Sequence, residues 1–175
     1  NVVTLTGIPF DVRREIDQIY LLGSFGVEAA EPGFRIVPPQ PLSLGSWRDQ
    51  GLPFFDREVG YRFEIPGDAP GVLAFGDDDW AGSYLVIEQT GEIVARLAES
   101  PFAVRLDPAL GREVTVRVIG LPKNLLGPFH APGNPRKRAW TPMWWGNGVP
   151  TEPQPGESYD LIDLGLFASP VWTAD

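Results

Sequence analysis

The chain has 175 residues, 43% hydrophobic and 21% charged, a composition that fits one soluble domain with its own core and leaves little room for two. Its formal net charge is −9, from 14 Lys and Arg against 23 Asp and Glu, so its field would repel nucleic acid. The absence of cysteine excludes disulfides, cysteine-ligated metals and thiol nucleophiles, and no apolar run approaches the roughly 18 residues that a membrane helix needs.

The chain opens with NVVTLTGIPF, which has neither an initiator Met nor the basic-then-apolar pattern of a signal peptide. We therefore expect residues 1–175 to be a single β-sandwich domain taken from a longer protein. A partner on a membrane is not expected from this sequence.

Alternation of apolar and polar residues, the period of a half-buried strand, recurs along the chain. VGYRFEI, residues 59–65, and EVTVRVI, residues 113–119, each place their large apolar side chains on one face. SYLVIEQTGEIVARL, residues 83–97, predicts a hairpin whose turn contains Gly91, a residue that can take a positive φ. Further strands are expected at residues 2–6, 18–22, 26–30, 34–38, 72–76, 102–106 and 159–167.

Convincing helical patterns are missing, while 20 Gly and 19 Pro separate the predicted strands. This distribution of turn residues between short strands is typical of all-β domains. The sequence therefore predicts an all-β fold, an antiparallel β-sandwich of the jelly-roll kind.

An acidic cluster, Asp77, Asp78 and Asp79, follows the strand expected at residues 72–76. Three carboxylates in one loop suit Ca²⁺, although their spacing is not that of an EF-hand. The alternative is a polar turn in which one aspartate accepts hydrogen bonds from backbone N–H groups.

The segment from His130 to Ser158 loses all periodicity and carries Trp140, Trp144 and Trp145, half of the six tryptophans. Loops of this length inside a domain tend to be functional or to pack on a neighbour. Two interpretations remain open. The indole rings stack on the apolar faces of sugars, or they fill one end of the sandwich and pack against an attached domain.

Nucleophilic and metal catalysis find little support in the sequence. His130 is the single histidine, and no G-x-S-x-G motif accompanies it, which argues against a serine hydrolase. One histidine without cysteine also argues against a zinc site. Among 23 acidic residues a catalytic carboxylate pair could exist, so a small glycosidase remains the least favoured alternative.

Four stretches resemble the galactose-binding-like jelly-roll domains attached to bacterial glycoside hydrolases, especially family two-like and rhamnosidase-like enzymes. They are GSWRDQGLPFFDREVGYRFEI, residues 45–65; SYLVIEQTGEIVARLAESPFAVRLDPAL, residues 83–110; NLLGPFH, residues 124–130; and YDLIDLGLFASPVW, residues 159–172. Two positions depart from the family pattern: EQTGE replaces an Asn-Gly-Lys turn, and Phe129 stands where many relatives have His.

The resemblance implies a non-catalytic accessory domain that binds carbohydrate or braces the catalytic domain of the same chain. On the binding interpretation, sugar stacks on the three tryptophans of the aperiodic segment. Polar contacts then come from Asn124, His130 and Arg136, with a structural Ca²⁺ near the acidic cluster. The resemblance alone favours a secreted or periplasmic protein. The alternative is a purely structural domain that packs on the catalytic barrel.

Overall fold

The computed structural model describes residues 4, 6, 20–30, 33–126 and 161–175. Its elements, in chain order, are β1 (Gly26–Ala29), β2 (Phe34–Val37), the 3-10 helix η1 (Arg48–Gln50), β3 (Glu58–Glu64), β4 (Gly71–Ala74), β5 (Trp80–Ala81), β6 (Tyr84–Gln89), β7 (Glu92–Leu97), β8 (Ala103–Leu106), the 3-10 helix η2 (Pro108–Leu110), β9 (Glu113–Ile119), α1 (Lys123–Leu126), β10 (Gly165–Leu166) and β11 (Val171–Ala174). The prediction of an all-β, antiparallel fold is confirmed. Across the described part of the chain, no helix is both long and apolar enough to cross a membrane.

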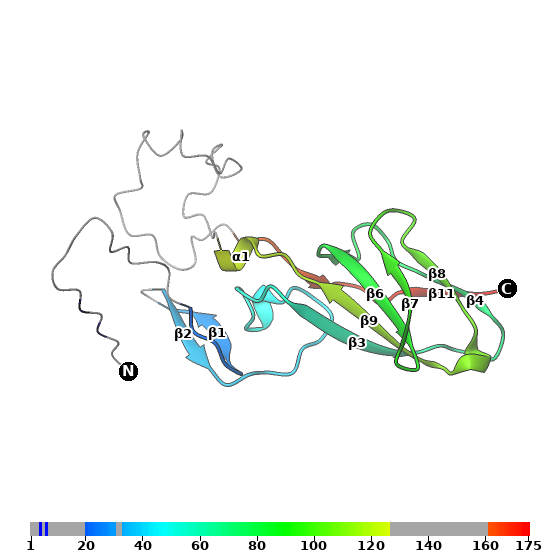
Figure 1. Cartoon of the computed structure of the whole chain (residues 1–175), viewed down its shortest axis with the longest axis horizontal. Helices are drawn as coiled ribbons and strands as arrows, with labels where there is room; N and C mark the ends of the chain where they lie inside the picture. The colour runs from blue at the N-terminus through cyan, green and yellow to red at the C-terminus, as the bar shows by residue number, and fades with distance from the viewer. Residues whose placement is uncertain (1–3, 5, 7–19, 31–32, 127–160) are drawn as a thin grey trace.

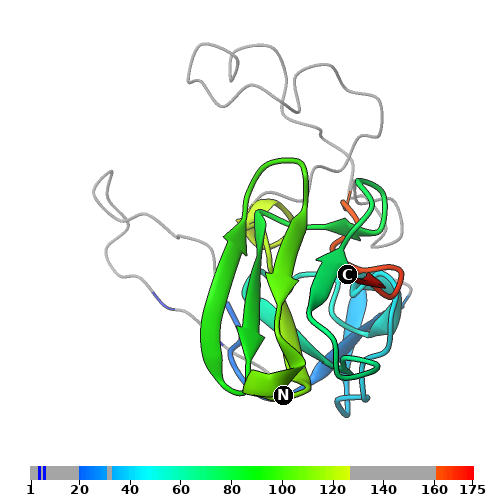
Figure 2. The same cartoon turned by 90° about the vertical axis from the view of Figure 1, so that its right-hand side faces the viewer.

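The strands form two main sheets and two short pairs. The larger sheet has the order β3-β9-β6-β7, and the second has the order β11-β4-β8. The pairs are β1-β2 and β5-β10. The hairpin β1–β2 and helix α1 lie at one end of the elongated domain, whereas the C-terminus lies at the other (Figure 1). In Figure 2 the red strand β11 lies on the opposite side of the domain from the green strands β6 and β7.

One hydrophobic core joins the two main sheets. Alternation along β9 buries Val114, Val116 and Val118 completely, and on β3 it buries Tyr61, which pairs with Val116. The second sheet contributes Leu73 and Leu106, among others, to the same cluster. Each side chain of this size stabilises the fold by about 1.5–3 kcal/mol when fully buried. The expected inward faces of residues 59–65 and 113–119 are therefore confirmed.

The predicted hairpin forms from β6 and β7, joined by Thr90 and Gly91. Both turn residues have positive φ, 53° for Thr90 and 88° for Gly91. Positive φ at both central residues defines a type I′ turn, whose twist matches that of the flanking strands. Glycine adopts this conformation without cost, but threonine is β-branched and pays for it in steric strain.

Replacing Thr90 with asparagine is expected to raise the free energy of unfolding by about 1 kcal/mol, because Asn tolerates left-handed φ and Asn-Gly favours type I′ turns. Urea unfolding followed by tryptophan fluorescence measures the change. The matched control is Gly91→Ala, which introduces strain at φ 88° and should act in the opposite direction. A midpoint for Thr90→Asn at or below that of the unchanged chain would contradict the steric argument.

Two strand predictions near the ends of the chain are wrong in extent. Residues 20–22 are described and lie outside any strand, and of residues 161–167 only β10 is a strand. Residues 161–167 alternate like a strand, but the carbonyls of Leu164 and Leu166 form single hydrogen bonds to a loop, described below, instead of a full strand ladder. Alternation does not predict β11, which pairs with β4 along its whole length; only the family-like stretch of residues 159–172 reaches into it.

Candidate ligand-binding pocket

A loop around Trp47 organises the end of the domain that carries α1. We call residues 43–51 the Trp47 loop and residues 161–166 the return segment. The Trp47 side chain is 1% exposed, and its Nε1 donates a 2.7 Å hydrogen bond to the Tyr61 hydroxyl on β3. The Trp47 backbone N–H donates to the Leu164 carbonyl at 2.8 Å. Trp47 therefore fixes its loop to both β3 and the return segment.

Close packing at Gly165 makes this arrangement possible. Gly165 has φ 141°, and a Cβ there would lie 2.4 Å from the Gly45 carbonyl oxygen and 3.1 Å from the Trp47 ring. No side chain fits such a space, and L-residues rarely adopt that φ. Glycine at this position is therefore required for the return segment to lie against the Trp47 loop.

Gln50 closes the Trp47 loop on itself. Its Oε1 accepts hydrogen bonds from the backbone N–H and the hydroxyl of Ser43, at 2.7 and 3.0 Å. Its Nε2 donates to the carbonyls of Ser43 and Ser46, at 3.2 and 3.1 Å. With both ends of the amide occupied, Gln50 holds the loop in one conformation.

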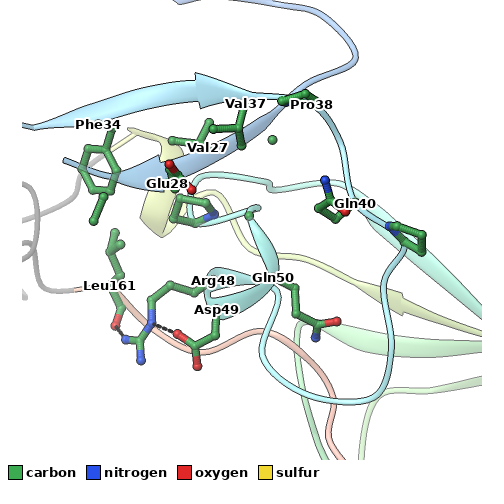
Figure 3. A pocket seen from close by; sticks show the side chains of 15 residues that line it. Val27, Glu28, Phe34, Val37, Pro38, Gln40, Arg48, Asp49, Gln50 and Leu161 are labelled. Atoms are coloured by element: carbon green, nitrogen blue, oxygen red, sulfur yellow. Dashed lines mark hydrogen bonds and ion pairs between the residues drawn. The ribbon is translucent and has the colours of Figure 1, made fainter.

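A cavity of about 680 Å³ lies between the β1–β2 hairpin and the Trp47 loop, and we call it the β1–β2 pocket (Figure 3). Its apolar walls are Val27, Phe34, Val37, Pro38, Pro41 and Pro53. Its polar side chains are Glu28, Gln40, Arg48, Asp49 and Gln50. Figure 3 shows Phe34 and Leu161 on one side of the pocket and Gln40 on the other. Apolar walls with a few polar groups are typical of small-molecule sites.

Arg48 connects the pocket to the return segment. Its Nη1 donates to the Leu161 carbonyl at 3.2 Å, and its Nη2 lies 3.2 Å from Asp163 Oδ1. Its Nε donates to Asp49 Oδ1 at 3.3 Å. The guanidinium therefore has two carboxylates and a carbonyl around it, and its charge is compensated within the protein.

Asn124, expected to contact ligand, is 2% exposed and lies on α1. Its Nδ2 donates to the Ile162 carbonyl at 2.8 Å, and its Oδ1 accepts from the Ile162 N–H at 2.9 Å. This pair of bonds reproduces the pairing of two neighbouring strands. Asn124 therefore fixes the return segment one residue from Leu161, whose carbonyl holds Arg48.

In the acidic cluster, Asp79 accepts a backbone hydrogen bond, as expected for the polar turn that was the alternative to a Ca²⁺ site. Asp79 Oδ2 accepts a 2.8 Å hydrogen bond from the Gly76 N–H, and the Asp79 carbonyl accepts from Phe167 N–H at 2.7 Å. Asp77 and Asp78 are exposed. Among the residues described, no three His, Cys, Asp or Glu side chains gather as a metal site. Calcium binding here stays a prediction.

A second hollow, of about 340 Å³, lies on the outer face of the larger sheet. Its central residue, Arg117, contacts Glu88 at 2.9 Å and Glu58 at 2.6 Å. The hydrogen bond to Glu88, and to a smaller extent the one to Glu58, raises the pKa of the Arg117 guanidinium. Because these charges satisfy one another and the lining is largely polar, this hollow is the weaker candidate for a ligand.

The remaining predicted site residues, His130, Arg136, Trp140, Trp144 and Trp145, lie outside the described residues. The sequence pattern does not predict the lining of the β1–β2 pocket. The available signal was the run PPQP, residues 38–41, between an expected strand and the GSW motif. Comparison with known proteins gives no match to a family model, a curated protein or a solved structure.

Proposed function

We propose that this chain is a non-catalytic, carbohydrate-binding accessory domain of a glycoside hydrolase, with a galactose-binding-like jelly-roll fold. The observation that carries the proposal is the β1–β2 pocket. A sugar ring presents an apolar C–H face and a rim of hydroxyls, and this pocket offers an aromatic ring and proline surfaces beside amide, carboxylate and guanidinium groups. Its volume, about 680 Å³, is sufficient for one or two sugar rings.

The positions of the family-like motifs support the same proposal. GSWRDQG supplies the Trp47 loop, and VGYRFEI supplies Tyr61, which binds Trp47. NLLG supplies Asn124, and DLIDLGLF supplies the Ile162 that Asn124 holds. Segments far apart in sequence thus meet at the Trp47 loop and the return segment, both of which contribute residues to the lining of the pocket, and this gives a physical reason for their occurrence together.

The aperiodic segment that carries the three tryptophans begins after α1 and ends before Leu161. Leu161 lines the pocket, and Asn124 on α1 is hydrogen-bonded to the neighbouring Ile162. We therefore propose that Trp140, Trp144 and Trp145, with His130 and Arg136, extend the binding region beyond the pocket. In this proposal Asn124 positions the return segment and does not touch the sugar, and Ca²⁺ near Asp77–Asp79 has a structural role.

Binding is tested by titrating the chain with a glycan panel, by calorimetry and tryptophan fluorescence, with and without Ca²⁺. Phe34→Ala is expected to weaken binding about two- to twelve-fold, the loss of one aromatic contact worth roughly 0.5–1.5 kcal/mol. Leu110→Ala is the matched control, since Leu110 is 70% exposed on η2 and remote in sequence from the pocket. Equal weakening by both variants, or no saturable binding of any glycan, would refute the assignment.

One observation favours a second function, packing on the catalytic domain. Tyr20, Leu21, Leu22 and Ile36, in and before the β1–β2 hairpin, are 43, 66, 92 and 56% exposed. Apolar side chains exposed in this way often mark interfaces. If the chain binds no glycan, self-association that depends on Leu21 and Leu22 would support this second function.

A further inference from the structure

We propose that the β1–β2 pocket selects uncharged sugars over acidic ones, and that Glu28 and Asp49 carry this selection. The inference rests on the proposed function, and it adds which class of sugar the pocket accepts. It follows from the charges that line the pocket and from how each is paired.

The pocket has one cationic side chain in its lining, Arg48, and that cation is already occupied. Asp49 and Asp163 lie 3.3 and 3.2 Å from its nitrogens, and the Leu161 carbonyl takes a third contact. A uronic acid carboxylate entering the pocket would have to displace one of these partners. Displacement would leave another carboxylate unpaired, so the exchange brings no net gain.

Two carboxylates of the lining, Asp49 and Glu28, are well exposed, although each pairs with an arginine, Arg48 and Arg35 respectively. The Asp49 side chain is 68% exposed and the Glu28 side chain 42% exposed. Glu28 pairs with Arg35, but that guanidinium is 70% exposed and is not part of the lining. Counting the lining alone, Glu28 and Asp49 against Arg48 leave one net negative charge, in a chain whose net charge is −9.

An uncharged sugar meets no such penalty. Carboxylate oxygens of Asp49 and Glu28 accept hydrogen bonds from sugar hydroxyls, and the Gln40 amide both donates and accepts. Phe34 and the prolines cover the apolar face of the ring. At about 7 Å in a water-like medium, each carboxylate should weaken binding of an anion about three-fold.

The test uses the isotope-labelled full chain and two-dimensional ¹H–¹⁵N NMR, which reports affinity and location together. The probes are methyl glycosides of glucose, galactose and mannose, with the methyl glycosides of glucuronic and galacturonic acid as their charged counterparts. The variants are Glu28→Gln, Asp49→Asn and the double variant. Glu99→Gln is the control, because it removes one exposed carboxylate from the linker between β7 and β8.

We expect neutral glycosides to shift signals of residues 26–29, 34–37, 40 and 48–51. They should bind about three-fold more tightly than the uronates, the effect of one net negative charge. The double variant should reduce this ratio about ten-fold, each single variant about three-fold, and Glu99→Gln should leave it unchanged. Added salt should strengthen uronate binding to the unchanged chain and leave neutral sugars unaffected.

Uronates that bind the unchanged chain as tightly as neutral sugars would overturn the inference and leave the proposed function intact. Sugar-dependent shifts confined to residues outside the pocket would overturn the inference and the assignment of the sugar site to the pocket, and would leave carbohydrate binding by the chain intact. Absence of shifts with all five probes would overturn both proposals together. Each variant's own spectrum shows whether its fold is retained, so a loss of structure cannot pass for a change in selection.

Discussion

Replacing Trp47 with alanine is expected to lower the free energy of unfolding by about 3–5 kcal/mol, the usual cost of deleting a buried large aromatic side chain. Trp47 is 1% exposed and packs edge-on against Phe55, with ring centroids 5.8 Å apart. Its removal would leave a cavity between the Trp47 loop, β3 and the return segment. Urea unfolding followed by circular dichroism measures the loss and also detects failure to fold.

Two milder variants separate packing from hydrogen bonding at this position. Trp47→Phe keeps a ring but loses the donor to the Tyr61 hydroxyl, and Tyr61→Phe removes that hydroxyl and keeps the ring. Each should cost about 1–3 kcal/mol, and a double-mutant cycle should give a coupling of about 1 kcal/mol. Additive effects of the two variants would show that the hydrogen bond does not stabilise the loop.

Replacing Asn124 with alanine is expected to cost about 2–3 kcal/mol, because two backbone groups of Ile162 lose their partners at once. Asn124→Asp keeps the shape of the side chain, but it places a carboxylate oxygen where the Ile162 carbonyl needs a donor. It should therefore also lower the free energy of unfolding. Chemical denaturation of the purified variants gives both values.

The matched control for Asn124 is Leu126→Ala on the same short helix, since Leu126 is 49% exposed and should cost much less. If Asn124 also contacted the ligand directly, Asn124→Ala would weaken sugar binding beyond any loss explained by unfolding. In the proposed arrangement, hydrogen exchange of the Gly45 and Trp47 amides, which donate to the Leu166 and Leu164 carbonyls, should instead increase, because the return segment is released. Unchanged exchange there would contradict the positioning role.

Local alternation was sufficient to predict most strands of the two main sheets. The periodicity of residues 59–65 and 113–119 predicted β3 and β9, because the inner face of each is covered by the core and the outer face is solvated. The turn around Gly91 predicted the hairpin β6–β7 for an equally local reason.

The pocket and the return segment depend on contacts that no local pattern encodes. Leu161 meets Arg48 across more than a hundred residues of chain, as the sequence separation of 113 between the two shows. DLIDLGLF alternates like a strand, yet within its described part only Gly165 and Leu166 pair with a strand. The Leu164 and Leu166 carbonyls accept hydrogen bonds from Trp47 and Gly45, which lie in a loop. The sequence likewise predicts Asn124 as a polar contact to ligand, because its partner, Ile162, lies 38 residues further along the chain.

The hydrogen bonds between Asn124 and Ile162 allow the sequence of this domain to diverge in one place during evolution. They hold the two flanks of residues 127–160 together, so the length of chain between them bears little on whether the sheets form. The entropic cost of closing a loop grows slowly with its length, by about 0.6 kcal/mol for each doubling. Insertions, deletions or replacement of residues 127–160 should therefore change the stability of the fold little. Evolution can vary the recognition sequence in that stretch without changing the core.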